Sequence, residues 1–329
     1  MLNVAQIGVG YWGPNLLRNL VMSKNCSVKT VVDFSKERRD YVQGLYPAVK
    51  VIADVEEVFQ DTKIDAVVIA TPVRTHFELS TRALKAGKHI LVEKPLATSV
   101  AEVDQIGSIA AEKNLLVMAG HTFLFNAAVR YAKTLIDSGS IGDVRFIYSQ
   151  RLNLGRIRSD VDALWNLAPH DVSIIQYWLG DPEPVSVHRY GVDYIQEKID
   201  DVVFMNIMYP NKIMANIHVS WLDPQKIRSM IVVGTRKMII YDDMADNKIA
   251  IYDKGIDRKV ITKEPMAHDK HQFPSFDHRS GDVLLPKIDF KEPLKMEIEH
   301  FIDCIQNGTK CLTGLDHARK VVEILAAGG

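Results

Sequence analysis

Cysteine is scarce in this sequence, with three residues among 329: Cys26, Cys304 and Cys311. An odd number without C-x-x-C spacing argues against a disulfide framework and against a zinc site, so we expect no bound metal. Scarce cysteine without a pattern is also typical of a reducing compartment. We therefore predict a cytoplasmic protein without structural disulfides.

An excess of either charge is also missing, because 40 Lys and Arg residues face 41 Asp and Glu residues and the formal net charge is -1. No block of basic residues stands out, so neither a nucleic acid nor an anionic membrane is an expected partner. No apolar run approaches the ~18 residues of a membrane-spanning helix, and the first expected strand begins at Leu2, so we expect no signal peptide. The expected ligand is a small molecule.

The length predicts two domains, which we place at residues 1–122 and 123–329. In the first, short apolar runs alternate with helical patterns, and the runs are continuous, as in strands covered on both faces. The expected strands are 2–8, 28–33, 66–71, 89–93 and 115–119, and the expected helices lie near 14–23, 35–45, 74–86 and 100–113. This alternation predicts an α/β fold with a doubly wound, parallel, Rossmann-type sheet.

The second domain has longer strands in which polar and apolar residues alternate, joined by tight links at 210–212 and 234–235. These links predict hairpins, and hence an α+β domain with a large, open, mostly antiparallel sheet. The expected strands are 144–152, 185–193, 202–209, 213–221, 228–233, 238–241 and 249–252. Helices are expected near 126–138, 294–307 and 315–327, and over 169–180 with Pro169 in the first turn. Gly328 and Gly329 follow the last helix as a C-cap or a truncated end.

The segment Gly8-Val9-Gly10-Tyr11-Trp12-Gly13 lies between an expected strand and an expected helix. In a dinucleotide fingerprint, Gly8 makes a tight turn, Gly10 lets the backbone approach a pyrophosphate, and Gly13 lets the helix pack on the strand. Asp33 ends the second strand, where an acid hydrogen-bonds the adenosine ribose and repels a 2′-phosphate. We therefore predict NAD as the cofactor, with a glycine turn that binds no ligand as the alternative.

Two bulky residues, Tyr11 and Trp12, occupy the free positions of this loop, where their backbone N–H groups still reach a pyrophosphate. We expect at least one of their side chains to lie along the pyrophosphate or the nicotinamide ribose. Lys36, Arg38 and Arg39 keep NADP as a less favoured alternative, although a solvated helix face explains them more simply.

Two further stretches lie at the carboxyl ends of expected strands, the edge where ligands bind in such sheets. Thr71 and Pro72 end one strand and His76 begins the next helix, so we expect these three to face the cofactor, with a capped helix as the alternative. In Glu93-Lys94-Pro95 the lysine is expected to point into the crevice, where an ammonium polarises a hydroxyl or carbonyl. A surface ion pair between Glu93 and Lys94 is the alternative.

The segment WNLAPHD, residues 165–171, places Asn166 and His170 on one face if it is helical. Histidine titrates near neutrality and is the usual proton-transfer group in alcohol oxidation. His170 is therefore a candidate acid or base, and a structural histidine is the alternative.

These stretches together, GVGYWG with Asp33, TPVRTH, EKP and NLAPHD, resemble the Gfo/Idh/MocA family of nicotinamide-dependent oxidoreductases. The resemblance covers essentially the whole chain and is more specific in residues 1–125. It implies a catalytic site between the two domains, with Lys94 and His170 as the catalytic pair and Glu93 beside the cofactor. It also implies a cis peptide at Lys94–Pro95 and a homodimer or homotetramer.

The family commonly has a D-x-x-x-H signature, and this chain has Asn166 where the aspartate belongs. Asparagine orients a histidine or binds a sugar hydroxyl but adds no negative charge that strengthens a base. Whether His170 or Lys94 takes the hydroxyl proton therefore stays open. The pair His170 and Asp171 is a further alternative, although adjacent helical residues do not share a face.

The stretches GYWGPNLLRN, AGHTFLFN and NLAPHD are most similar to the family branch that acts on nucleotide-linked sugars. That branch implies oxidation or reduction at carbon 3 of a hexose, such as UDP-N-acetylglucosamine or its uronate, in glycan biosynthesis. The candidate contacts of the substrate are Asn126, Arg151, Asn153, Arg156, Trp165, Asn166 and His170. An NAD-dependent glycosidase that oxidises carbon 3 transiently and a non-catalytic NAD-binding sensor remain as alternatives.

Overall fold

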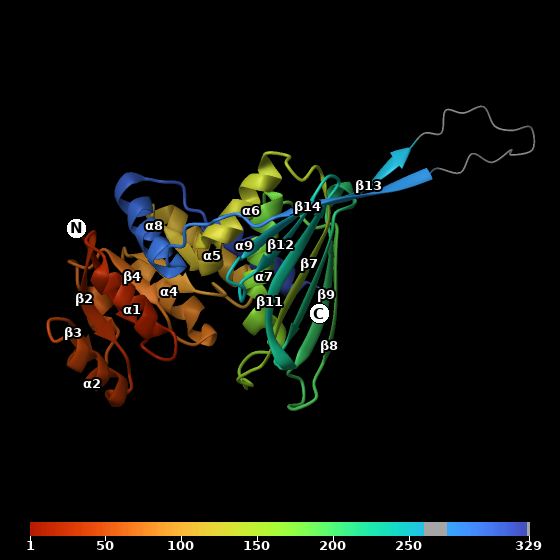
Figure 1. Cartoon of the computed structure of the whole chain (residues 1–329). Coiled ribbons are helices and arrows are strands. Elements are labelled where there is room, and N and C mark those ends of the chain that lie inside the picture. Colours follow the sequence, from red (N-terminus) through yellow and green to blue (C-terminus); the bar gives the residue numbers. More distant parts are fainter. Residues whose placement is uncertain (260–274, 328–329) are drawn as a thin grey trace, which may run out of the picture. The chain divides into compact units, whose positions relative to one another are not determined.

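The computed structural model describes residues 1–259 and 275–327 (Figure 1). The chain divides by packing into two compact units. Unit 1 consists of Met1–Ala127, Asp160–Glu183 and Phe290–Gly329, and unit 2 consists of Ala128–Ser159 and Pro184–Asp289. The chain end at Gly328 and Gly329, for which we considered a C-cap or a truncation, lies outside the described residues.

Unit 1 contains a six-stranded sheet in the order β3-β2-β1-β4-β5-β6, and all neighbours in it are parallel. The strands are β1 (Leu2–Ile7), β2 (Cys26–Val32), β3 (Lys50–Ile52), β4 (Ala66–Ile69), β5 (His89–Glu93) and β6 (Val117–Gly120). Their apolar runs are buried on both faces, as in β4, where every residue is 0% exposed. The doubly wound, parallel sheet is confirmed. The short β3 was not predicted because three residues carry no readable pattern.

Helices pack on this sheet and begin and end largely where the sequence predicts. Their bounds are α1 (Gly13–Met22), α2 (Lys36–Leu45), α3 (Glu56–Gln60), α4 (His76–Lys85), α5 (Val100–Lys113), α7 (Ala163–Leu179), α8 (Pro293–Asn307) and α9 (Leu315–Ala326), with 3-10 turns η1 (Val73–Thr75) and η2 (Thr122–Phe125). The side chain of Ser99 accepts a hydrogen bond from the backbone N–H of Glu102 and so caps α5, as expected. Just past α4, Gly87 has φ 77°, the left-handed conformation that stops a helix.

The helix predicted over 169–180 starts earlier than expected, and this prediction was wrong in its first residue. The carboxylate of Asp162 accepts a hydrogen bond from the backbone N–H of Trp165 and caps α7. Pro169 therefore lies inside the helix rather than in its first turn. A proline there cannot donate to the carbonyl one turn earlier. The cap and the burial of the apolar residues of α7 offset that loss.

Two helices from the end of the chain complete the core of unit 1. Ala318 and Val322 of α9 belong to an apolar cluster with residues of β1, β4 and β5. Leu294, Ile298 and Phe301 of α8 belong to a second cluster with other residues of the same sheet. The domain boundary predicted after residue 122 is a single cut in the sequence. By packing, α7, α8 and α9, which all follow that cut, belong to unit 1 together with the parallel sheet.

Unit 2 contains an eight-stranded sheet in the order β14-β13-β12-β11-β7-β10-β9-β8. All neighbours are antiparallel except β7 and β10, which are parallel, so the mostly antiparallel sheet is confirmed. The elements are α6 (Ala127–Asp137), β7 (Val144–Leu154), β8 (Ser186–Val192), β9 (Val202–Met208), η3 (Pro210–Lys212), β10 (Met214–Ser220), β11 (Leu222–Gly234), β12 (Met238–Asp242), β13 (Ile249–Lys259) and β14 (Ser275–Leu284). The strand β14 was not predicted because its sequence, SFDHRSGDVL, has few apolar residues.

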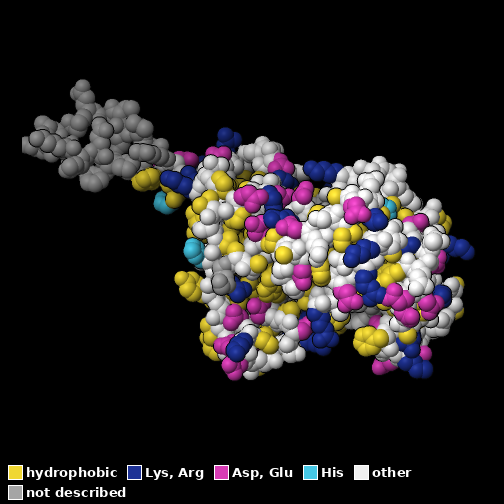
Figure 2. Space-filling view, turned by 180° about the vertical axis from the view of Figure 1, so that it is seen from behind, with side chains coloured by type: hydrophobic (Ala, Val, Ile, Leu, Met, Phe, Trp, Pro, Cys, Tyr) yellow, Lys and Arg dark blue, Asp and Glu magenta, His cyan; other side chains and the backbone are white. Residues whose placement is uncertain are grey.

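The surface carries charges of both signs. On the face drawn in Figure 2, basic and acidic side chains are interspersed, in agreement with the near-neutral composition. No helix within the described ranges is long and apolar enough to cross a membrane.

Candidate active site

The three glycines of the loop after β1 lie in three different environments. Gly8 has φ 92°, and a Cβ there would stand 2.8 Å from the carbonyl oxygen of Ala70. A Cβ on Gly13 would stand 2.5 Å from the carbonyl oxygen of Gly8, so the start of α1 packs tightly on the strand end. A Cβ on Gly10 would meet nothing within 4 Å. Packing therefore requires the first and third glycines, and the second leaves one side of the loop open to a ligand.

A buried amide that the sequence analysis missed braces this loop. The Nε2 of Gln6 donates to the carbonyl oxygens of Gly8 and Gly13, at 2.9 and 2.8 Å. The available signal was a single amide side chain within an otherwise apolar run. The helix that follows, α1, has no side-chain cap and carries Pro14 in its first turn. Its N-terminus is therefore suited to bind an anionic diphosphate.

Asp33 lies directly after β2 and touches the glycine loop. Its Oδ2 accepts a hydrogen bond from the backbone N–H of Val9, and its Oδ1 accepts one from the backbone N–H of Ser35, both at 2.9 Å. A carboxylate keeps further lone pairs for ribose hydroxyls. The guanidinium of Arg39 donates to the carbonyl oxygens of Asp33 and Phe34, each at 2.8 Å, and so lies beside the same strand end. These residues fit the adenosine ribose and diphosphate of a dinucleotide.

The loop after β4 lies against the glycine loop, because a Cβ on Gly8 would stand 2.9 Å from Cγ2 of Thr71. Thr71 and the adjoining Pro72 thus lie beside the loop that we expect to bind the cofactor. His76 is 1% exposed, with Nδ1 2.8 Å from the carbonyl oxygen of Pro95 and Nε2 2.9 Å from that of Thr71. Burial lowers the pKa of His76, although both carbonyl oxygens favour the charged ring. His76 thus holds these two loops together, and its expected contact with the cofactor remains a prediction.

Lys94 follows β5, and the peptide bond between Lys94 and Pro95 is cis, as the family resemblance implied. The Nζ of Lys94 donates to the backbone carbonyl oxygen of Asn166 in α7, 2.8 Å away. Pro169 lies in the next turn of α7. Proline has no backbone N–H to donate, and its ring crowds the turn before it. The carbonyl that binds Lys94 therefore belongs to a turn of α7 that proline disturbs.

His170 lies on α7 one turn after Asn166, so the shared helix face is confirmed. Its half-buried ring contacts Phe123 of η2 at a tilt of 61°, with ring centroids 4.8 Å apart. Because Lys94 is bonded to the turn that precedes His170, both predicted catalytic side chains belong to one region of unit 1. Trp165, a predicted substrate contact, packs partly against the apolar core of the same unit.

Glu93 links the glycine loop to Lys94. It accepts hydrogen bonds from the side chain of Trp12 and, at 3.2 Å, from the backbone N–H of Lys94. Burial raises the pKa of Glu93 to about 7, against the opposing effect of the Lys94 charge. Trp12 is 41% exposed and Tyr11 is 86% exposed. The expectation that one of the two lies along the cofactor remains a prediction.

A second buried acid, Glu297 of α8, was missed by the sequence analysis. It is 0% exposed, and its Oε2 accepts a hydrogen bond from Oγ1 of Thr122 at 2.8 Å. Burial, and after it the charge of Glu93, raises the pKa of Glu297 well above its ordinary value. The available signal was helical spacing, because Glu297 shares a face with the core residues Leu294 and Phe301.

His121, directly after β6, is another titratable group that the sequence analysis missed. It is 2% exposed, and its ring contacts that of His317 with centroids 5.5 Å apart. Burial, and after it the charges of His317 and Lys94, lowers the pKa of His121 well below its ordinary value and thus favours the neutral ring. Its position at the carboxyl end of a strand was the available signal.

The remaining candidate contacts of the substrate divide between the two units. Asn126, 4% exposed, follows η2 in unit 1. Arg151 and Asn153 lie two positions apart in β7 of unit 2, so their side chains leave the sheet on the same face. Arg156 follows that strand and is exposed. These four assignments remain predictions.

Comparison with known proteins identifies one family over most of the chain. Residues 2–121 match the oxidoreductase family with an NAD-binding Rossmann fold, and residues 129–240 match the GFO/IDH/MocA C-terminal domain. The chain belongs to the GFO/IDH/MocA family. The predicted Rossmann fold, the NAD cofactor and the oxidoreductase class are thereby confirmed.

Relatives in the family carry different activities. A 2,7-anhydro-N-acetylneuraminate hydratase of Mediterraneibacter gnavus is 25% identical over 96% of this chain and 86% of the relative. A scyllo-inositol 2-dehydrogenase (NAD(+)) of Bacillus subtilis is 28% identical over 95% of this chain and 89% of the relative. A UDP-N-acetylglucosamine 3-dehydrogenase of Acidithiobacillus ferrooxidans is 29% identical over 59% of this chain and 60% of the relative.

The solved structure of the Acidithiobacillus enzyme has a TM-score of 0.79 against this chain, with 24% identity over 98% of this chain and 95% of that one. At this identity the likeness establishes the fold. The sequence alignment spans 60% of the length of that enzyme and of an oxidoreductase from Streptococcus pneumoniae. The substrate is therefore a matter for proposal.

Proposed function

We propose that this protein transfers a hydride between nicotinamide and carbon 3 of a nucleotide-linked hexose, such as UDP-N-acetylglucosamine or its uronate. Bound NAD supplies the hydride acceptor or donor. The protein residues bind the sugar and move the hydroxyl proton. We also propose that the protein acts in the cytoplasm in glycan biosynthesis and that it forms a homodimer or homotetramer.

The hydrogen bond from Lys94 to Asn166 is the observation that carries this proposal. It holds the ammonium of Lys94, at the carboxyl end of β5, against the turn of α7 that precedes His170. A fixed positive charge stabilises the alkoxide that forms when a hydroxyl loses its proton. A histidine, which titrates near neutrality, is suited to accept that proton. We therefore assign charge stabilisation to Lys94 and proton transfer to His170.

The replacement of the family aspartate by Asn166 agrees with this division. Asn166 holds Lys94 through its backbone carbonyl, so the bond does not depend on a carboxylate at this position. The amide side chain can then serve a sugar hydroxyl as donor or acceptor. The likeness to the UDP-N-acetylglucosamine 3-dehydrogenase supports a nucleotide sugar as the substrate.

The hydratase from Mediterraneibacter favours a second candidate function, a reaction on a sugar without net oxidation. Hydration of an anhydrosugar, or glycoside cleavage through transient oxidation, would consume no NAD overall. A sensor that binds NAD without catalysis would show no turnover at all.

One experiment separates these functions. The protein is incubated with NAD⁺ and a panel of UDP- and dTDP-sugars, while NADH is followed by absorbance and the sugar by mass spectrometry. Loss of two hydrogens with equal NADH formation supports the dehydrogenase. Addition of water or release of a sugar without NADH supports the second candidate.

Two substitutions test the residues. Lys94→Met and His170→Gln should each reduce kcat by about 10²-fold or more, the usual range for acid–base and electrostatic groups. The controls are Lys113→Met and His188→Gln, which change exposed residues to which no role in the site is assigned. Wild-type turnover in both Lys94→Met and His170→Gln would contradict the assignment.

A further inference from the structure

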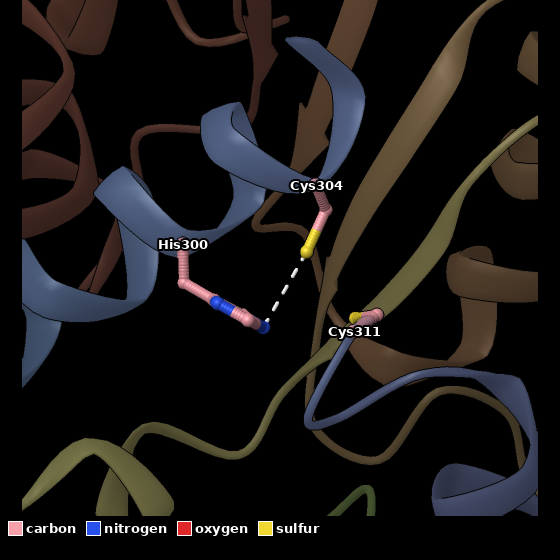
Figure 3. Close-up of side chains that lie close together, drawn as sticks. All are labelled: His300, Cys304 and Cys311. Carbon is pink, nitrogen blue, oxygen red and sulfur yellow. Dashed lines mark hydrogen bonds between the residues drawn. The ribbon is translucent and has the colours of Figure 1, made fainter. Parts of the chain in front are cut away.

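Three metal-ligating side chains converge in unit 1, and none of them is among the residues assigned to catalysis (Figure 3). His300 and Cys304 lie one turn apart on α8, and Cys311 lies on the connection between α8 and α9. One nitrogen of His300 and the sulfurs of Cys304 and Cys311 all lie within 4.8 Å of one another. The side chains point toward a common centre, and the Sγ of Cys304 is 3.4 Å from Nε2 of His300.

We propose that His300, Cys304 and Cys311 bind a thiophilic divalent metal ion, with Zn²⁺ as the expected ion and water as the fourth ligand. Zinc takes Cys sulfur at about 2.3 Å and His nitrogen at about 2.0–2.1 Å, so neighbouring ligand atoms of a tetrahedral site stand roughly 3.5–3.8 Å apart. Atoms that already lie within 4.8 Å reach that spacing through small side-chain rotations.

The tautomer of His300 suits this role. The backbone N–H of Leu312 donates to Nε2 of His300 at 2.9 Å, which identifies Nε2 as the nitrogen that carries the lone pair. This lone pair also faces the Sγ of Cys304. A metal ion bound to Nε2 would replace the hydrogen bond from the N–H of Leu312. Leu312 lies in the connection between α8 and α9, so no helix hydrogen bond would be lost.

A metal ion binds the thiolate form of cysteine and displaces the thiol proton, so a buried sulfur such as that of Cys304 can serve as a ligand. Cys304 is buried, whereas His300 and Cys311 are half-buried, so an ion has access to the cluster.

The absence of C-x-x-C spacing led the sequence analysis to expect no metal. That criterion counts cysteines and misses a histidine one helical turn before Cys304. The site would tie the connection after α8 to the body of that helix, so the expected role is to stabilise unit 1. It takes no part in hydride or proton transfer.

The test uses the full chain, stripped of metal by a chelator and kept reduced, and titrated with Zn²⁺ or Co²⁺. We expect one ion per chain, a thiolate-to-cobalt charge-transfer band with Co²⁺, and a higher Tm with Zn²⁺. Loss of a residue that hydrogen-bonds a metal ligand typically lowers the metal affinity about 10- to 100-fold. Loss of a ligand itself should have at least this effect, so we expect Cys304→Ser, Cys311→Ser and His300→Gln each to lower the metal affinity by about 10- to 100-fold or more.

The matched control is Cys26→Ser, because Cys26 is buried in the same unit, but its Sγ hydrogen-bonds the carbonyl oxygen of Leu20. This variant should keep the cobalt band. Absence of the band in the wild-type protein, or an equally strong band in Cys304→Ser, would overturn the proposal even if one variant failed to fold.

Discussion

The Nζ of Lys94 and the backbone carbonyl oxygen of Asn166 lie 2.8 Å apart, although 72 positions separate the two residues in the chain. The contact joins the end of β5 to the first turn of α7. Because it uses the backbone of Asn166, the identity of that side chain can vary without loss of the contact. This relationship makes the role of position 166 open to a direct test.

Asn166→Asp should retain the lysine contact and keep turnover within about 10-fold of wild type. The added carboxylate lies one turn before His170, and a nearby negative charge favours protonated histidine. The pH dependence of kcat/KM should therefore move its acidic limb to higher pH. A steady-state pH profile measures this, with Lys94→Met as the reference for loss of activity. A loss as large as in Lys94→Met would show that the asparagine side chain itself is required.

Gly10→Ala should bind NAD much more weakly while the protein stays as stable as the wild type. The new Cβ meets no protein atom within 4 Å, so any effect arises from crowding of the ligand. The measurement is NAD⁺ affinity by calorimetry together with Tm.

The control for this glycine is Gly44→Ala. Gly44 lies inside α2 with nothing within 4 Å of its Cβ position. Alanine there should raise the free energy of unfolding by about 0.5–1 kcal/mol and leave NAD⁺ affinity unchanged. Unchanged affinity in Gly10→Ala would argue against a pyrophosphate beside this loop.

Glu297→Gln should make stability less dependent on pH. The pKa of Glu297 is raised well above 4.5 in the folded protein, so the folded state binds more protons than the unfolded state above pH 4.5. Stability from this group is therefore complete below the unfolded pKa and declines as pH rises toward the folded pKa. Urea unfolding at pH 5 and pH 8 should show a smaller decline in the variant, while Glu112→Gln on an exposed helix end should match wild type.

Asp33→Asn should weaken NAD⁺ binding and reduce the preference of the protein for NAD⁺ over NADP⁺. The amide keeps the size of the carboxylate but removes the charge that repels a 2′-phosphate, and Arg39 lies beside the same strand end. We expect roughly a 10-fold change in the ratio of the two dissociation constants, which corresponds to about 1.4 kcal/mol of binding free energy. Equal binding of both cofactors by the wild-type protein would remove the role given to Asp33.

The sequence predicted the parallel sheet because its strands are unbroken apolar runs with turn residues at their ends. Gly8, Gly13 and Asp33 were found because each occupies a fixed place in a known strand–loop–helix unit. Such local patterns depend on residues that are close in the chain. The same reasoning placed Lys94 and His170 at an element end and on a helix face.

The contacts between distant segments were beyond the same reasoning. The bond from Lys94 to α7, the burial of Glu297 and the indole of Trp12 on Glu93 depend on how elements pack. The start of α7 was misplaced because Pro169 usually marks a first turn, whereas the cap at Asp162 determined the helix start. Tertiary packing decided each of these cases.

The core of unit 1 has a consequence for synthesis. A ribosome makes β1 through β6 first, but the apolar surface that those strands present to α8 and α9 stays uncovered until residues 290–329 are made. The segments of unit 2 are made in between, and their sheet has its own internal pairing. The part of the chain that is made first is thus among the last to be completed, and its partly formed sheet needs protection from aggregation until α9 emerges.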